Sequence, residues 1–237
     1  MRAEPFRDPK GVAKYRHEVL AVVFRVLADT PSLQVLAWQR HHEPFAGQWA
    51  LPSGPVEVSE TMRDAMERHL ADKLDLVAVR HSEQLATLSA PLRDPAERTI
   101  ATAYLGLVAE ATEVVKGGAH WFDVSTLPQM AFDHDEVVRL GAHRLRGKIS
   151  YSNIAFALAP DEFTLAHLRE IYMGVLYHDV DVTNLGRVLT RRHQIEPTGH
   201  RTAPGQKGGR PARTYRFVEH SLHITDPFAV LRGDQKR

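Results

Sequence analysis

The chain has 237 residues, of which 43% are hydrophobic, a formal net charge of +1 and no cysteine. This length suits one large or two modest domains, and the lack of cysteine excludes both a disulfide framework and a thiolate metal site. The longest early apolar run, 19–24, is too short to cross a bilayer and the charged amino terminus has no targeting pattern, so we expect a cytoplasmic protein without membrane contact.

Two apolar segments near the amino terminus predict a pair of strands. Residues 17–27 are rich in Val and Leu, which is typical of a strand buried on both faces. Residues 33–40 follow a Pro-Ser turn and alternate in hydrophobicity, which indicates a second strand. We expect the two to form a hairpin that leads into the loop at Gly47.

Residues 47–76 combine a Trp-Ala-Leu-Pro strand, a glycine and a predicted helix. The apolar stripe of this helix recurs at every fourth position and consists of Met62, Met66, Leu70 and Leu74. His69, Asp72 and Lys73 are spaced i, i+3 and i+4, so the helix projects their side chains from one face toward a common point. The alternative is an amphipathic surface helix with no chemical role.

The following segments complete a mixed α/β arrangement. Strands are predicted at 77–89, at 99–109 and around Trp121 and Phe122, with a polar loop at 91–97 and a helix at 132–146. A mixed sheet with helices against it forms an α/β/α sandwich, which we expect to occupy roughly the first 145 residues.

Residues 47–76 resemble the signature of the Nudix superfamily. The residues in register with that signature are Gly54, Glu60, Arg68 and Leu70. Where a hydrolase of the family carries metal-binding glutamates, this chain has His69, Asp72 and Lys73. Asp75 also replaces the usual closing glycine. The resemblance implies that the scaffold is retained and the catalyst is lost.

The substituted positions remove the ligands that magnesium needs. Three carboxylates on one helix face would form an oxygen site for this ion, which prefers carboxylate, carbonyl and water ligands. His69 is a poor magnesium ligand, and the Lys73 ammonium repels the ion. Only Asp72 and Glu60 remain as oxygen donors. We therefore predict no metal, no required cofactor and no catalytic residue.

A second, helical pattern begins near residue 161. Asp161 or Thr164 can cap a first helix, and after a short connection Asp181 or Thr183 can cap a second. The core positions of the first helix are Leu168, Ile171, Tyr172, Val175 and Leu176. Those of the second helix are Leu185, Val188 and Leu189.

Two strands and a basic loop follow this helix pair. The predicted segments are a strand at 195–199, a loop at 200–213 and a strand at 214–218. Alternation places Tyr215 and Phe217 toward the core and turns Thr214 and Arg216 outward. A helix pair followed by a basic hairpin is the order of a winged helix-turn-helix.

The basic residues of this carboxyl-terminal part predict contact with duplex DNA. A helix enters the major groove with its amino-terminal residues at base edges, so Asn184 and Arg187 are placed for base contact and Thr183 lies beside them. The residues expected at phosphates or in the minor groove are Arg191, Arg192, Arg201, Lys207, Arg210 and Arg213. A solvated basic hairpin without a partner is the alternative.

Two further sequence runs, residues 131–135 and residues 208–217, point to one family within this superfamily. Together with a degenerate Nudix segment before a winged helix, they resemble NrtR, a family of Nudix-related transcriptional regulators. The resemblance implies a homodimeric repressor of NAD biosynthesis and salvage genes that binds a palindromic operator and is released by ADP-ribose or a related metabolite. We expect a Nudix-like domain at 1–148, a linker at 149–160 and a winged helix-turn-helix domain at 161–237.

The effector pocket is expected where a hydrolase would hold its substrate. Its predicted members are Arg40, Trp49, Ser53, Gly54, Arg68 and Arg98. Arg40 and Arg98 can bind diphosphate oxygens, because a guanidinium matches them with two hydrogen bonds. Trp49 is better explained as a core residue, and Arg68 is either free for a phosphate or structural. The alternatives are a working pyrophosphatase with an accessory tail and a regulator with another effector, such as a nucleoside diphosphate sugar or NAD.

Overall fold

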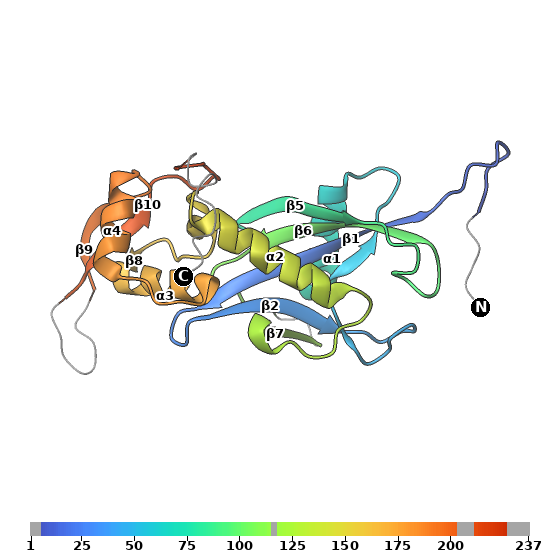
Figure 1. Ribbon diagram of the computed structural model, residues 1–237, viewed down its shortest axis with the longest axis horizontal. Coiled ribbons are helices and arrows are strands. Elements are labelled where there is room, and N and C mark those ends of the chain that lie inside the picture. The colour runs from blue at the N-terminus through green and yellow to red at the C-terminus, as the bar shows by residue number, and fades with distance from the viewer. Residues whose placement is uncertain (1–5, 115–117, 203–210, 227–237) are drawn as a thin grey trace, which may run out of the picture. The chain divides into compact units, whose positions relative to one another are not determined.

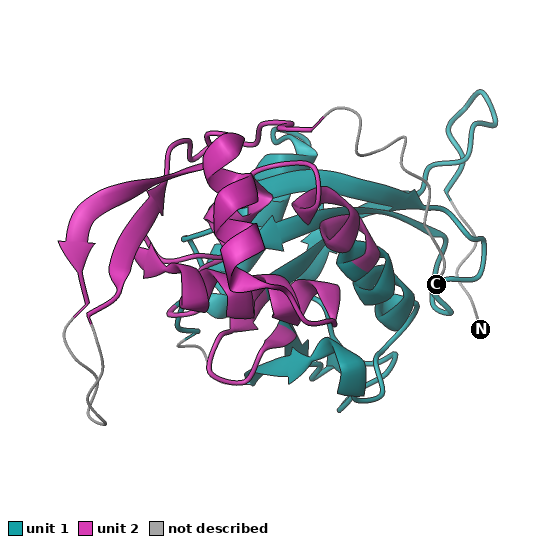
Figure 2. Ribbon diagram, turned by 60° about the vertical axis from the view of Figure 1, so that its left-hand side comes forward, with its two compact units in different colours: residues 1–24, 34–107, 112–142 teal, residues 25–33, 108–111, 143–237 magenta. Residues whose placement is uncertain are grey.

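The computed structural model describes residues 6–114, 118–202 and 211–226 and divides the chain into two compact units (Figure 1, Figure 2). Unit 1 contains residues 1–24, 34–107 and 112–142, and unit 2 contains residues 25–33, 108–111 and 143–237. Among the described residues, no helix has the length and apolar character needed to span a bilayer.

The sheet of unit 1 is mixed and is organised around β1 (Arg16–Leu27). Its other strands are β2 (Ser32–Gln39), β3 (Trp49–Ala50), β4 (Ser53–Pro55), β5 (His81–Leu88), β6 (Thr99–Leu107) and β7 (Ala119–Asp123). The order is β3-β2-β1-β6-β5, with β4 paired to β1 and β7 paired to β2. β1 runs parallel to β6 and antiparallel to β4.

The central position of β1 explains its sequence. Residues 19–24 are all buried, so the strand is continuously apolar instead of alternating. The predicted hairpin is confirmed, because β1 and β2 are neighbours in the sheet. The strand predicted at 99–109 corresponds to β6, and Trp121 and Phe122 lie on β7.

Two longer helices accompany this sheet, α1 (Met62–Leu74) and α2 (His134–Ile149), together with a short 3-10 helix, η1 (Val124–Thr126). α1 begins with a capping box between Thr61 and Asp64, which satisfies two backbone N–H groups at the helix start. Within unit 1, a Cβ atom at Gly141 of α2 would lie 2.9 Å from the Phe24 ring. The absence of a side chain at Gly141 therefore lets α2 pack closely on β1.

Unit 2 contains a helix pair and a small three-stranded sheet. The elements are η2 (Ile154–Ala157), β8 (Phe163–Thr164), α3 (Leu165–Leu176), α4 (Val182–Arg191), β9 (Ile195–Arg201) and β10 (Arg213–Phe217), and the strand order is β8-β10-β9. Thr164 caps α3 and Asp181 caps α4, one of the two alternatives predicted in each case. The fold is thus α/β followed by a winged helix, as predicted.

The outward orientation predicted for Thr214 is wrong. Thr214 is only 8% exposed, and its hydroxyl oxygen lies 2.5 Å from the hydroxyl oxygen of Thr198. The pairing of β10 with β9 shifts register between Arg213 and Tyr215, and this irregularity breaks the simple alternation. Beyond the shift, Phe217 is buried and Arg216 is exposed, as the alternation predicts.

The segment 149–160, expected as a linker, is largely buried. All four residues of η2 are buried, and Asn153 ties the segment to the end of the described chain. Its side-chain Nδ2 donates to the Ser221 carbonyl at 2.9 Å, and its Oδ1 accepts from the His223 backbone N–H at 2.7 Å. The segment therefore belongs to the packed part of unit 2. The boundaries 1–148 and 161–237 stay a prediction.

Candidate functional site

Helix α1 brings His69 against the short strand β4. A Cβ atom at Gly54 would lie 2.2 Å from the His69 ring, so the imidazole occupies the space that a side chain would fill. The His69 Nε2 lies 2.9 Å from the Pro55 carbonyl, to which it donates. Burial lowers the pKa of His69, and the residue is 7% exposed. His69 thus packs the helix onto β4.

Lys73 lies one turn further along α1 and contacts the same strand. Its ammonium donates to the Ser53 carbonyl and lies 4.7 Å from the centre of the Trp38 ring. Burial lowers the pKa of Lys73, and nearby cations lower it further. His69 and Lys73 therefore engage the carbonyls on either side of Gly54.

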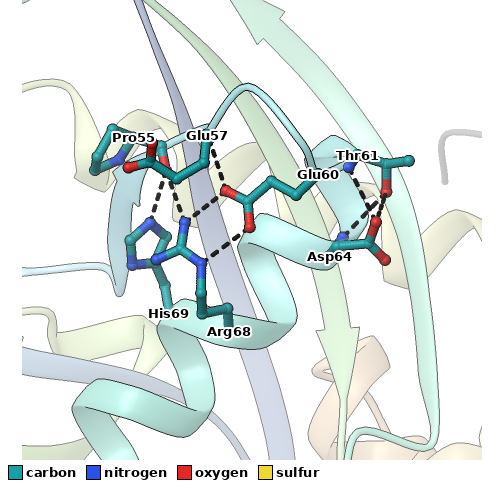
Figure 3. A network of polar contacts seen from close by, with 7 residues as sticks. All are labelled: Pro55, Glu57, Glu60, Thr61, Asp64, Arg68 and His69. Carbon is teal, nitrogen blue, oxygen red and sulfur yellow. Dashed lines mark hydrogen bonds and ion pairs between the residues drawn. The ribbon is translucent and has the colours of Figure 1, made fainter.

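Arg68 is committed to Glu60 in an ion pair with two hydrogen bonds (Figure 3). The Arg68 Nε and Nη2 donate to the two carboxylate oxygens of Glu60 at 2.9 and 2.5 Å, and Nη2 also reaches the Pro55 carbonyl at 3.2 Å. The hydrogen bond from Arg68 lowers the pKa of Glu60 to about 2. Of the two roles open to Arg68 in the sequence, these contacts favour the structural one.

The three substituted positions do not converge. His69 is buried, Lys73 is half-buried and Asp72 is exposed. The spacing predicted a common point, but His69 and Lys73 turn toward β4 while Asp72 remains at the solvent surface of α1. Within the described ranges, no three His, Asp or Glu side chains are placed to hold a metal ion.

Arg40, at the end of β2, lies among aromatic residues. Its Nε donates to the Pro44 carbonyl at 2.9 Å, and its guanidinium lies 4.7 Å from the centre of the Phe132 ring. Phe45 packs edge-on against Phe132 with ring centres 4.9 Å apart. Burial lowers the pKa of Arg40. The charge of Arg40 also acts on Lys73, so the two cations belong to one electrostatic environment.

Two further predicted pocket members make their contacts elsewhere. Trp49 is half-buried and packs edge-on against Phe122, with ring centres 4.6 Å apart. Arg98 donates to the Ala90 carbonyl at 3.1 Å and lies 5.2 Å from the centre of the Tyr15 ring. The structure therefore gathers Ser53, Gly54 and Arg68 at the junction of β4 and α1, with Arg40 within electrostatic reach.

The exposed face of α4 carries the residues predicted to contact bases. Thr183, Asn184, Arg187 and Arg191 are all exposed, and the Arg187 Nη2 donates to the Asn184 Oδ1 at 2.8 Å. This face borders a groove of about 570 Å³ lined by Leu165, Val182, Thr183, Gly186, Arg187, Thr190, Arg191 and Tyr215. Polar and cationic side chains thus stand at the amino-terminal end and along one side of an exposed helix.

The remaining basic residues differ in their availability. Arg192 donates to the Ser150 carbonyl at 3.1 Å and to the Asp226 carboxylate at 2.5 Å, so it connects three segments of unit 2. Arg201 and Arg213 are exposed and face one another across β9 and β10. Lys207 and Arg210 lie outside the described residues.

Comparison with known proteins connects the two units to described domains. A model of the NUDIX domain matches residues 15–141, more than half of the chain, and a model of the NrtR DNA-binding winged helix domain matches residues 155–217. The chain belongs to the NUDIX family and carries a winged helix domain of the NrtR type.

Two relatives of this NUDIX chain carry different functional names. The chain is 27% identical over 207 residues to the ADPR responsive transcriptional repressor NtrR of Acinetobacter baylyi. This match covers 84% of this chain and 81% of that protein. The chain is 31% identical over 137 residues to the ADP-ribose pyrophosphatase of Methanocaldococcus jannaschii, covering 56% of this chain and 78% of that protein.

Solved structures of Shewanella oneidensis NrtR are also similar. Its complex with a 27mer DNA has a TM-score of 0.72 and 25% identity, covering 84% of this chain and 92% of that chain. Its NUDIX domain complexed with ADP ribose has a TM-score of 0.51 and 28% identity, covering 58% of this chain and 93% of that chain.

Two buried groups of this NUDIX chain carry no recognisable sequence signal. Arg93, in the loop predicted as polar, is 9% exposed and binds both carboxylate oxygens of Asp133 at 2.9 and 2.6 Å. The buried His134 accepts a hydrogen bond from the Leu51 backbone N–H at its Nδ1 at 3.0 Å. The run at 131–135 contains Asp133 and His134, but no local pattern reveals partners that lie 40 and 83 residues away.

Proposed function

We propose that this chain is a dimeric, DNA-binding transcriptional repressor whose Nudix unit binds ADP-ribose without hydrolysing it. The observation that carries the proposal is the exposed face of α4, where Asn184, Arg187 and Arg191 stand on a winged helix that follows a Nudix unit. The repressor of Acinetobacter baylyi, which resembles most of the chain, supports the same assignment.

DNA binding follows from how a helix enters the major groove. Asn184 and Arg187 lie in the first two turns of α4, where side chains reach base edges, and Arg187 can contact a guanine through two hydrogen bonds. Arg191, Arg201 and Arg213 are exposed cations suited to phosphates. Two such units related by two-fold symmetry would bind a palindromic operator. The complex of Shewanella oneidensis NrtR with a 27mer DNA supports DNA as the partner.

Effector binding follows from the cations of unit 1. Arg40 and Lys73 are half-buried, and burial disfavours the charged form of each. A diphosphate would supply the negative charge that such a site favours, and the guanidinium of Arg40 can bind it with two hydrogen bonds. The NUDIX domain of Shewanella oneidensis NrtR complexed with ADP ribose supports ADP-ribose as this ligand.

Loss of hydrolysis follows from the donor groups at α1. A magnesium ion that polarises a diphosphate needs several oxygen ligands. Here the Glu60 carboxylate accepts two hydrogen bonds from Arg68, and the Ser53 carbonyl accepts a hydrogen bond from the Lys73 ammonium. These residues do not fit a divalent metal, so we expect the unit to bind its nucleotide and leave it intact.

A gel-shift titration tests the main proposal. The protein should shift a duplex that contains its operator, and added ADP-ribose should release that duplex while leaving a random duplex unaffected. Ligand binding changes DNA affinity only through different affinities for the two conformations of the protein, so release also requires a coupled structural change. Unchanged operator binding up to millimolar ADP-ribose contradicts this effector.

A working pyrophosphatase is the second candidate, favoured by the similarity to the enzyme of Methanocaldococcus jannaschii. Incubation of the protein with ADP-ribose and either magnesium or manganese separates the two proposals. The enzyme must release AMP, whereas the sensor leaves ADP-ribose intact. Calorimetry with NAD and a nucleoside diphosphate sugar tests whether a different nucleotide is the effector.

A further inference from the structure

We infer that Lys73 is a built-in cation that binds the diphosphate of the effector, so that effector binding requires no divalent metal ion. This inference rests on the proposed function and adds a specific residue and a specific ionic requirement to it. Lys73 comes from α1, the helix on which a Nudix hydrolase carries its metal-binding glutamates.

The ammonium of Lys73 is held in place with hydrogen-bonding capacity to spare. It has three N–H donors, and within the described residues its one hydrogen bond is to the Ser53 carbonyl. The Trp38 ring covers one side of the ammonium at 4.7 Å, an arrangement that favours a cation. Both contacts fix the position of the charge, and two donors remain for oxygens of a ligand.

The charges around Lys73 are mostly positive. After burial, which lowers the pKa of Lys73, Glu18 has the largest effect and raises it, whereas Arg40, Arg16 and Arg68 each lower it. Glu18 pairs with Arg16 at 2.7 Å, and Arg68 pairs with Glu60. Among the described residues, neither Lys73 nor Arg40 has a carboxylate within ion-pair distance. Two half-buried cations that repel one another form a site that a bound dianion would stabilise.

The same geometry disfavours a metal ion. The carbonyls of Ser53 and Pro55 accept from Lys73 and His69, so neither is freely available as a ligand. A divalent cation next to a fixed ammonium would also be repelled. A diphosphate carries a negative charge on each phosphoryl group, so Lys73 as a point charge and Arg40 as a planar fork can share it. The protein thus supplies charge that a hydrolase would obtain from its metal.

Calorimetry on the full-length wild-type protein tests the ionic requirement. ADP-ribose is titrated in excess EDTA and, in parallel, in millimolar magnesium chloride. We expect the same affinity in both buffers. An affinity that depends on magnesium overturns the inference while leaving ADP-ribose as the effector. Failure to bind in either buffer overturns the proposed effector, and the inference with it.

The variant Lys73→Gln tests the residue. A lost charge-assisted hydrogen bond should weaken ADP-ribose binding about 10- to 100-fold in EDTA. Arg63→Gln is the matched control, because Arg63 lies on the exposed side of the same helix and pairs with Glu67. Tryptophan fluorescence establishes that each variant is folded. Wild-type affinity in folded Lys73→Gln overturns the inference, and if that variant does not fold, the metal comparison decides.

Discussion

The position of the His134 ring keeps this side chain uncharged. The residue is 2% exposed, and its Nδ1 accepts from the Leu51 N–H, which requires that nitrogen to be unprotonated. Burial lowers the pKa of His134 to about 3, and the charge of Arg93 acts in the same direction. Protonation of His134 would therefore break a backbone contact and bury a charge near another cation.

This neutral state predicts acid sensitivity of unit 1. Between the ordinary histidine pKa of 6.5 and a value of about 3, the unfolded chain binds a proton at His134 that the folded chain does not. The contribution of neutral His134 to the free energy of unfolding is thus fully present above pH 6.5. It is lost as the pH falls, with a slope of up to about 1.4 kcal/mol per pH unit. Urea unfolding followed by tryptophan fluorescence measures it, since Trp38, Trp49 and Trp121 all lie in unit 1.

The variant His134→Asn separates this residue from the other histidines. Asparagine can still accept from the Leu51 N–H through its side-chain oxygen, but it does not titrate. We expect the free energy of unfolding of the variant to fall less steeply with decreasing pH than that of the wild type. The difference in slope should be up to about 1.4 kcal/mol per pH unit. Parallel pH profiles for the two proteins would mean that another group causes the acid sensitivity.

Single residues also show the limit of prediction from sequence. The residue types at positions 69 and 73 predict an altered metal site, which stays a prediction. The actual partners of His69 and Lys73 are backbone carbonyls of β4, which carry no sequence signal. Thr214 was assigned to the wrong face because a register shift in a strand pair depends on both strands.

At the scale of elements, the packing of α1 on β4 depends on Gly54. A Cβ atom there would overlap the His69 ring, with 2.2 Å to its Cε1, although the backbone at Gly54 has an ordinary conformation. Helix α1 could be predicted from its apolar stripe. The glycine requirement could be seen only as part of a motif, because the clashing ring comes from 15 residues further along the chain.

The variant Gly54→Ala should therefore destabilise unit 1 by about 1–3 kcal/mol, the usual cost of overpacking. A double-mutant cycle in urea identifies the cause. In a His69→Ala background the added methyl group has room, so the same substitution should cost much less. Additive costs in the double variant would show that Gly54 is needed for a reason other than the His69 ring.

At the scale of the whole molecule, the order of two domains could be predicted from sequence but the composition of each unit could not. Residues 25–33 of the β1–β2 hairpin belong to unit 2. There a Cβ atom at Gly174 of α3 would lie 2.7 Å from the Val26 side chain, so α3 packs closely on the hairpin tip. Val26 and Gly174 are far apart in the chain, and sequence periodicity contains no information about such a contact.

DNA recognition by the whole protein leads to the last prediction. Arg187→Ala should weaken binding to the operator by about 1–3 kcal/mol, since one pair of hydrogen bonds to a base is lost. Arg216→Ala is the matched control, because Arg216 lies in the same unit and is held by Glu196 at 2.8 and 2.6 Å. Fluorescence anisotropy at one fixed salt concentration compares both variants on an operator selected by the wild-type protein and on a random duplex.

The ratio of the two affinities decides the role of Arg187. A base contact acts only when the correct base is present, so Arg187→Ala should reduce operator binding while leaving the random duplex nearly unchanged. Loss of a phosphate contact would instead weaken both duplexes equally, and that result would remove Arg187 from base recognition. Because Asn184 accepts a hydrogen bond from Arg187 in the described structure, its substitution by Ala should relax the same base preference.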